Sequence, residues 1–191
     1  MSQLFEQIRL DHVHIAQLLD ILDHQLNILS EAGGADFELI CDIIRYMTTY
    51  PDTVHHPREG LMFERLLAHD ASAADLLRDL TTEHRLLAEK GAACMEIMRQ
   101  VIDGAMVRRD QIEALGREYV ALLRAHMDKE DTDAFPRLEK NLTDEDWRAL
   151  DASLDPQDDP VFGPQVEAQF DSLLTFIHQH SADRHPPPED L

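Results

Sequence analysis

The sequence has few basic residues and few cysteines, and each shortage excludes a class of protein. Lysine and arginine number 17 against 38 aspartates and glutamates, which gives a formal net charge of −21 at pH 7. A chain this acidic repels phosphate, so we expect neither nucleic acid nor an anionic membrane surface as a partner. The two cysteines, Cys41 and Cys94, lack the spacing of a disulfide framework, a zinc ribbon or a c-type haem site. We expect both thiols to be buried.

Long apolar runs are also missing. No segment approaches the roughly 18 apolar residues that span a bilayer, and the N-terminus lacks the basic start and apolar stretch of a secretory signal. The sequence therefore predicts a cytoplasmic protein. Hydrophobic residues make up 43% of the 191 positions, which is enough for one well-buried core.

Glycine and proline are sparse, and the apolar residues between them recur every three to four positions, as in amphipathic helices. Four long helices are predicted over about residues 4–30, 40–66, 77–101 and 112–130. Pro51 and Pro57 fall inside the second, where we expect a kink or a break. The short joints force neighbouring helices to be antiparallel. The predicted fold is all-α, an up-down-up-down four-helix bundle with a short C-terminal helical extension.

The composition changes after residue 142. We predict a bundle domain over residues 1–142 and an extension over residues 143–191. The extension should contain a short helix capped by Thr143 that docks Trp147 on the bundle, and an amphipathic helix from about Val166 to Ile177. Residues 185–191 are rich in proline and are expected to form a frayed end.

The chain contains 11 histidines, and four of them follow a repeated plan. Each half carries a lone histidine and then, 43 or 42 residues later, a His-x-x-x-Glu pair. The six residues are His12, His55, Glu59, His84, His126 and Glu130. At about 100° per residue, each pair points to one face of its helix, and all six fall on the core-facing stripe.

Two buried carboxylates beside four imidazoles need a compensating charge, and the sequence offers little buried arginine or lysine. Imidazole suits divalent iron, copper, nickel or zinc, and carboxylates bridge pairs of ions. Six ligands are too many for one tetrahedral zinc and suit a pair of irons with an open position. We interpret His56 and Asp131 as neighbours of the ligands, and Asp11 and Glu83 as groups that tune an imidazole by hydrogen bonding.

At these residues the sequence resembles the hemerythrin-like (HHE cation-binding) family, in its bacterial single-domain form, over about residues 3–140. The matching motifs are Asp11-His12, His55-His56-Pro57-Arg58-Glu59, Glu83-His84 and His126-Met127-Asp128-Lys129-Glu130 with Phe135-Pro136. The resemblance implies a non-haem centre of two iron ions in a four-helix bundle, with both glutamates bridging the irons and the histidines capping them.

Two positions depart from the oxygen carriers of that family. Those proteins have a further histidine where this chain has Ala88, and their last carboxylate falls at the position of Asp131 instead of Glu130. The missing histidine leaves an iron with fewer protein ligands. The chain therefore resembles the six-ligand relatives implied in sensing or handling oxygen, iron or peroxide more than the carriers.

Three functions remain open on the sequence. The first is a protein that binds or senses O2, peroxide or NO at an open iron position. The second is a di-iron peroxidase or catalase-like enzyme, in which Glu83 or His56 moves protons. The third is an adaptor bundle whose acidic surface binds a protein partner. A homodimer also stays open. Ferritin-like chemistry is disfavoured because the four helices contain no Glu-x-x-His pair.

Overall fold

The chain is helical throughout the part that the structure describes. The computed structural model describes residues 2–31, 33–154 and 157–184, and helices are the only regular elements in these ranges. The chain divides into two compact units, residues 1–156 and 157–191. None of the described helices is both long and apolar enough to cross a membrane.

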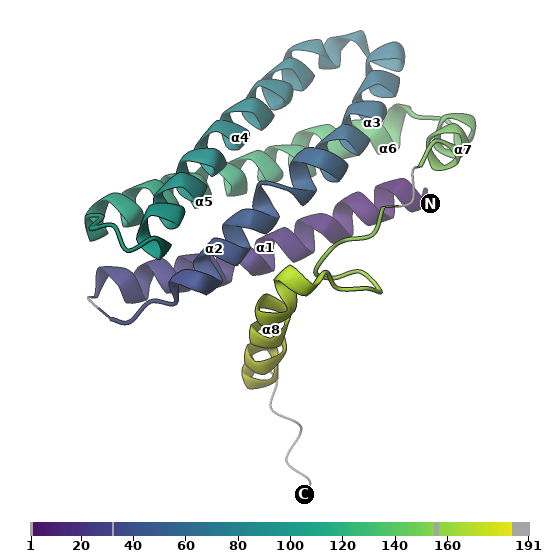
Figure 1. The fold of residues 1–191 in the computed structure, drawn as a ribbon. Helices are drawn as coiled ribbons and strands as arrows, with labels where there is room; N and C mark the ends of the chain where they lie inside the picture. Colours follow the sequence, from purple (N-terminus) through teal and green to yellow (C-terminus); the bar gives the residue numbers. More distant parts are fainter. Residues whose placement is uncertain (1, 32, 155–156, 185–191) are drawn as a thin grey trace, which may run out of the picture. The chain divides into compact units, whose positions relative to one another are not determined.

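The first unit is a bundle of four antiparallel rods, as predicted, and Figure 1 shows them running alternately up and down. Two rods are single helices, α1 (Gln3–Ser30) and α4 (Ala74–Ile102). The other two are composite. The second rod comprises α2 (Phe37–Met47), the π-helix η1 (Pro51–His55) and α3 (His56–His69). The fourth comprises α5 (Arg109–Lys129), the π-helix η3 (Glu130–Ala134) and α6 (Phe135–Asn141).

Local side-chain chemistry explains where the rods begin and end. The side chains of Ser2 and Asp36 accept hydrogen bonds from backbone N–H groups in the first turns of α1 and α2, which satisfies donors that lack a helical partner. Gly104 follows α4 with a positive φ of 81°, the left-handed conformation that glycine adopts most easily. Short connections result, and they keep successive rods adjacent.

The break expected in the second rod is present. Pro51 has no backbone N–H, and the π-helical turn begins at this residue. Pro57 lies in the first turn of α3, where a missing N–H costs nothing. The π-helical turn in the fourth rod was not predicted. It begins at Glu130, so each composite rod carries a π-helical turn at its His-x-x-x-Glu pair.

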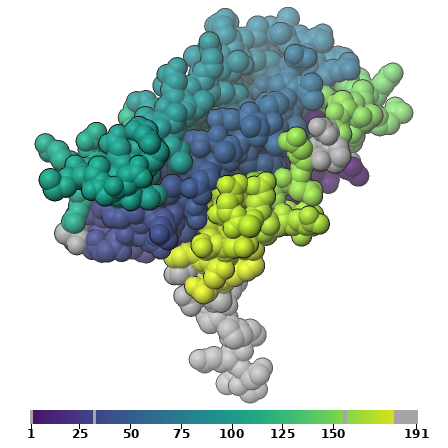
Figure 2. Space-filling view, viewed as in Figure 1, coloured from purple at the N-terminus to yellow at the C-terminus, as the bar shows by residue number. Residues whose placement is uncertain are grey.

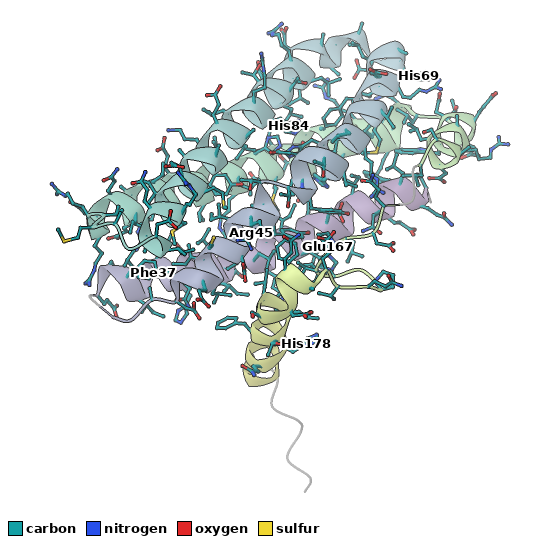
Figure 3. The ribbon with its side chains drawn as sticks, in the orientation of Figure 1. Phe37, Arg45, His69, His84, Glu167 and His178 are labelled. Carbon is teal, nitrogen blue, oxygen red and sulfur yellow. The ribbon has the colours of Figure 1, made fainter. Side chains whose placement is uncertain are left out.

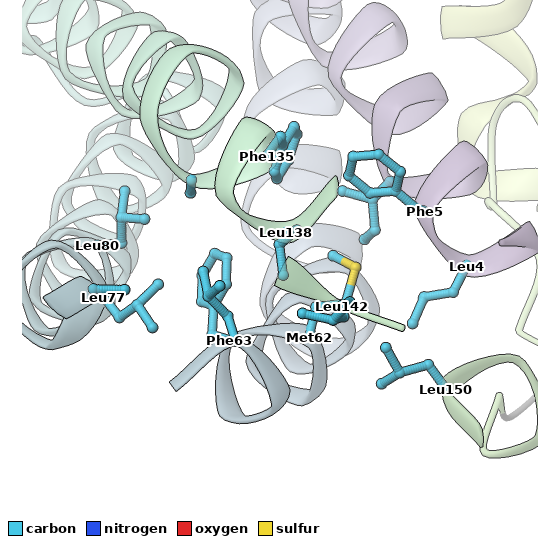
Figure 4. Close-up of a cluster of buried hydrophobic side chains, with 14 residues drawn as sticks. Leu4, Phe5, Met62, Phe63, Leu77, Leu80, Phe135, Leu138, Leu142 and Leu150 are labelled. Atoms are coloured by element: carbon cyan, nitrogen blue, oxygen red, sulfur yellow. The ribbon is translucent and has the colours of Figure 1, made fainter. Parts of the chain in front are cut away.

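A cluster of buried side chains closes the end of the bundle where α1 begins, and Figure 4 shows many of its members. Phe5 packs edge-to-face on Phe135 with ring centroids 5.4 Å apart, and its ring lies 5.3 Å from that of Trp147. Trp147 belongs to α7 (Asp144–Ala152), which Thr143 caps through a reciprocal capping box with Asp146. The predicted short helix and the docking of its tryptophan are confirmed.

The side chains of α2, α3 and α4 cover one face of the bundle. In Figure 2 the blue side chains of α2 and α3 lie against the teal side chains of α4 on that face. Cys41 of α2 and Cys94 of α4 are both buried free thiols, as expected. The second and third rods are therefore neighbours in the bundle.

The second unit contains the 3-10 turn η4 (Ala168–Phe170) and α8 (Asp171–Arg184). The amphipathic helix predicted here exists, but its expected start near Val166 was wrong. Residues 168–170 form a tighter turn first, and Leu173 and Ile177 of α8 are buried. The predicted frayed end, residues 185–191, lies outside the described residues.

Candidate metal centre

The structure brings all six sequence-predicted residues together in the middle of the bundle. They come from every rod: His12 from α1, His55 from the end of η1, Glu59 from α3, His84 from α4, His126 from α5 and Glu130 from the start of η3. Five of them are buried, and the side chain of His84 is 15% exposed. Figure 3 labels His84 on α4.

Glu59 lies at the centre of this arrangement, and its two oxygens face different histidines. Oε1 lies 3.2 Å from Nε2 of His55 and 3.7 Å from Nε2 of His12. Oε2 lies 3.4 Å from Nε2 of His84. One carboxylate therefore reaches two groups of imidazoles, which we call the His12 side and the His84 side.

Glu130 repeats the pattern from the opposite rod. Its Oε2 lies 3.4 Å from Nε2 of His12. Its Oε1 lies 3.3 Å from Nε2 of His126 and 3.5 Å from Nε2 of His84. Both glutamates therefore extend one oxygen toward the His12 side and the other toward the His84 side, the arrangement that bridging carboxylates require.

The central atoms have no hydrogen bonds of their own. Both carboxylate oxygens of Glu59 and Glu130, and Nε2 of His12, His84 and His126, are buried without a hydrogen-bond partner among the described residues. Each unsatisfied buried polar atom costs free energy, on the order of 1–3 kcal/mol and more for a charge. Such a concentration of orphaned acceptors fits cations bound between the two sides.

The outward-facing ring nitrogens, by contrast, contact carboxylates. Asp11 accepts a hydrogen bond from Nδ1 of His55 at 3.0 Å, and Glu83 accepts one from Nδ1 of His126 at 2.9 Å. Nδ1 of His12 lies 3.2 Å from Asp131. A proton held on Nδ1 leaves the Nε2 lone pair directed at the centre, which is the form that binds metals.

The hydrogen bonds expected between Asp11 or Glu83 and an imidazole are therefore present, but each carboxylate bonds a histidine on another helix. Asp11 precedes His12 in sequence and bonds His55. Glu83 precedes His84 and bonds His126. In each half of the chain, the acidic residue that precedes the lone histidine bonds the histidine of the His-x-x-x-Glu pair. This agrees with the repeated plan found in the sequence.

His56 belongs to the centre more directly than the sequence indicated. Its ring stacks on that of His84, with centroids 3.9 Å apart and planes 17° apart. His56, His84 and His126 each offer a ring nitrogen within 4.8 Å of the others. Nδ1 of His56 lies 3.3 Å from Asp52. The sequence contains a signal for this, the adjacent pair His55-His56. Because adjacent residues on a helix point about 100° apart, His56 was expected to lie beside the ligands and not among them.

The charges of the centre stabilise one another. Burial lowers the pKa of His12, but Asp131, Glu130 and Glu59 outweigh this effect and raise it to about 11. Burial raises the pKa of Glu130, as does the Glu59 charge, yet the neighbouring imidazoles lower it to about 2. Without a metal, protonated histidines thus balance ionised glutamates. A cation that replaces these protons would serve the same purpose.

His56 behaves differently from the other imidazoles. Burial lowers its pKa, and the hydrogen-bonding contact with Asp52 only partly offsets this effect. Its ring is therefore neutral at pH 7, the state in which imidazole ligates metals.

Residues 3–138 match the family described as the Hemerythrin HHE cation binding domain. The chain belongs to this family. No individual curated protein and no solved structure matches the chain. The HHE domain covers all four rods of the bundle as far as α6, and it contains every residue of the centre described above.

The two departures noted in the sequence have structural counterparts within the HHE domain. Glu130, and not Asp131, contributes the central carboxylate, because Asp131 turns outward to His12 and its side chain is 49% exposed. Ala88 has no ligand atom, whereas His56 supplies an additional imidazole on the His84 side. The third histidine on the His84 side therefore comes from α3, whereas the histidine missing at Ala88 would have come from α4.

Proposed function

We propose that this HHE domain holds two iron ions and binds O2 or a related small ligand, such as peroxide or NO, for sensing or handling it. The observation that carries the proposal is the central pair of glutamates, each with one oxygen toward each group of imidazoles. A single ion would not use both oxygens of both carboxylates in this way.

The ligand sets differ between the two sides. His12 and His55 would hold one ion together with oxygens of Glu59 and Glu130. His84 and His126 would hold the other with the remaining oxygens, and His56 would add a third imidazole. When bound, iron supplies reversible one-electron redox chemistry and a coordination position for a small ligand.

The residues around the centre keep the imidazoles ready for this role. Asp11 is fully buried and also accepts hydrogen bonds from Gln7 and Tyr50, so its contact with His55 is fixed from two other directions. Lys129 donates to Glu83, which in turn accepts from His126. Phe135 stacks on the ring of His12, with centroids 5.2 Å apart. These contacts restrict the rings before any ion binds.

The experiment is anaerobic mixing of the iron-loaded, reduced protein with O2 in a stopped-flow spectrometer. The proposal predicts a rapid change in the visible spectrum that requires both irons. An unchanged spectrum would contradict it.

A peroxidase or catalase-like activity is the second candidate. Of the two residues considered for moving protons, Glu83 is disfavoured because its contacts with Lys129 and His126 lower the pKa of its carboxyl despite burial. His56 is the better candidate, since it is neutral and lies beside Asp52 at a cavity next to the centre. Release of O2 from peroxide at a rate above that of free iron would support this function, and a rate equal to free iron would exclude it.

A further inference from the structure

An apolar cavity lies inside the bundle, away from the proposed iron centre. All four rods contribute to its lining, among them Leu26 of α1, Ile44 of α2, Cys94 of α4 and Ile112 of α5. These residues lie near the last turns of α1 and α4 and the first turns of α2 and α5 (Figure 1). The cavity is therefore at the end of the bundle opposite to the cluster around Phe5.

A stretch of helix separates this cavity from the centre on each rod. Leu22, a lining residue of α1, follows His12 by ten residues, and Gly116 of α5 precedes His126 by ten residues. Ten residues of α-helix extend about 15 Å along the axis. A molecule in the cavity therefore does not contact the histidines and glutamates of the centre.

The lining is hydrocarbon apart from two sulfur atoms. Its ten residues are leucine, isoleucine, methionine, cysteine and glycine, so none has a side-chain nitrogen or oxygen. Sγ of Cys94 lies 3.9 Å from the carbonyl oxygen of Leu115, to which it donates. Burial raises the pKa of this thiol to about 12, so it is uncharged at pH 7. The lining therefore offers a guest neither a charge nor a free side-chain hydrogen-bonding group.

The size of the cavity limits its guest further. The volume is about 20 Å3 for the centre of a water-sized molecule, and one water needs about 10–15 Å3 by this measure. The space thus holds one very small molecule and excludes organic ligands. Water has a suitable size, but it would give up its hydrogen bonds on entry, which is why apolar cavities stay dry. An uncharged diatomic gas fits both the size and the lining.

The cavity comes closest to solvent between α4 and α5. Ile97 of α4 and Leu115 of α5 are half-buried, whereas Leu22 and Leu26 of α1 and Ile44 of α2 are 1% exposed or less. Rotamer changes of exposed side chains take nanoseconds or less. Movements of these two side chains are therefore enough to admit a small gas molecule.

We propose that this cavity binds O2 at a site that needs no metal. O2 is uncharged, diatomic and poorly hydrated, so it gains free energy when it leaves water for apolar surroundings. The inference goes beyond the proposed function, because it assigns the chain a second place for O2 that is independent of the iron centre.

The experiment uses the full chain with zinc in place of iron, because zinc is diamagnetic and has no redox chemistry. O2 is itself paramagnetic, and it accelerates the relaxation of nearby methyl protons in an NMR spectrum. N2 at the same pressure is the diamagnetic control. We expect a larger O2 effect at the methyl groups of Leu26 and Ile44 than at those of Leu4 and Ile8, which are equally buried in the cluster at the other end. Equal effects at the two ends would overturn the inference.

Two cysteine variants place the O2 in the cavity. Cys94→Leu puts additional carbon atoms into the lining and should abolish the excess relaxation at Leu26 and Ile44. Cys41→Leu is the matched control, since Cys41 is also a buried free thiol but does not line the cavity, and it should keep the wild-type effect. Excess relaxation that persists in Cys94→Leu would overturn the inference.

A measurement on the wild-type protein stands even if Cys94→Leu folds poorly. A water molecule resident in the cavity would give nuclear Overhauser effects between its protons and the methyl groups of Leu26 and Ile44. We expect none, and their presence would overturn the inference because the site would already be occupied. No iron is present in any of these samples, so a failure of the proposed iron chemistry and a failure of this inference are separate results.

Discussion

The carboxylate of Asp11 lies 3.0 Å from Nδ1 of His55, a histidine on another rod of the bundle. Asp11 is fully buried, and Gln7 and Tyr50 donate hydrogen bonds to its other oxygen. The pair shows how the centre is organised: an imidazole whose Nε2 faces the two glutamates is oriented through its Nδ1 by a carboxylate of a neighbouring helix.

The first prediction concerns this pair. Asp11→Asn keeps the shape of the side chain but removes its charge, so the imidazole of His55 becomes a weaker ligand. We expect iron affinity to fall by about 10- to 100-fold, the usual effect of losing such a contact. Competition with a chelator of known affinity measures it. Asp20→Asn on the exposed face of the same helix is the control, and an equal affinity in both variants would contradict the role assigned to Asp11.

The second prediction concerns pH in the metal-free protein. The pKa of His55 and of His84 is raised to about 9, because nearby carboxylates outweigh the effect of burial. A histidine whose folded pKa exceeds its unfolded value near 6.5 stabilises the fold fully below pH 6.5 and loses this contribution as the pH rises to the folded pKa. We therefore expect the unfolding temperature to fall between about pH 6.5 and pH 9.

The iron-loaded protein should behave in the opposite way. Metal-bound histidines carry no proton, whereas the same histidines in the unfolded chain bind protons below their usual pKa near 6.5, so the stability of the iron-loaded form rises with pH up to about pH 6.5 and then levels off. Calorimetry of both forms between about pH 5 and pH 9 measures how the unfolding temperature of each depends on pH. Parallel profiles for the two forms would show that the histidines are not exchanging protons for metal.

The third prediction assigns His56. If it supplies an imidazole to the His84 side only, His56→Ala should reduce the iron content toward one per chain and leave the other ion in place. His69→Ala is a control, since that side chain pairs with Asp146 away from the centre. Elemental analysis of both variants decides it. Two tightly bound irons in His56→Ala would make His56 a neighbour of the centre, as the sequence alone suggested.

The fourth prediction concerns packing at Gly91. A Cβ there would lie 2.4 Å from Cγ2 of Thr48, so Gly91→Ala should destabilise the protein by about 1–3 kcal/mol. Thr48→Ser removes that methyl group and retains the hydroxyl that bonds to the carbonyl of Ile44. The double variant should recover most of the loss. Urea unfolding of the three variants measures this, and additive losses in the double variant would contradict the contact.

Much of this molecule follows from periodicity and spacing. Apolar residues that recur every three to four positions form one stripe along each helix, and these stripes are enough to predict the four rods. A His-x-x-x-Glu pair on such a stripe must face the interior. The convergence of His12 and His84 on the same two glutamates also follows, because the halves of the chain repeat the same plan. The fold, and the convergence of these six residues in the interior, could therefore be predicted from the sequence.

The remaining features depend on the orientation of each rod about its own axis relative to its neighbours. The spacing of residues along the sequence does not determine this orientation. That Asp11 reaches His55 and Glu83 reaches His126 is a property of helix packing. His56 was discounted because neighbours on a helix point about 100° apart, which excludes two adjacent ligands only if the centre is a single point. The centre has two sides, and His55 and His56 face one each.

In the proposed centre both glutamates serve two ions, and the metal content of Glu59→Gln tests this arrangement most directly. The iron-loaded wild-type protein should contain two irons per chain by elemental analysis. Because one oxygen of Glu59 faces each side, the substitution should weaken both sites together and bring the content well below one iron per chain. One fully retained iron in this variant, or a wild-type protein that takes up only a single ion, would contradict a centre bridged by carboxylates.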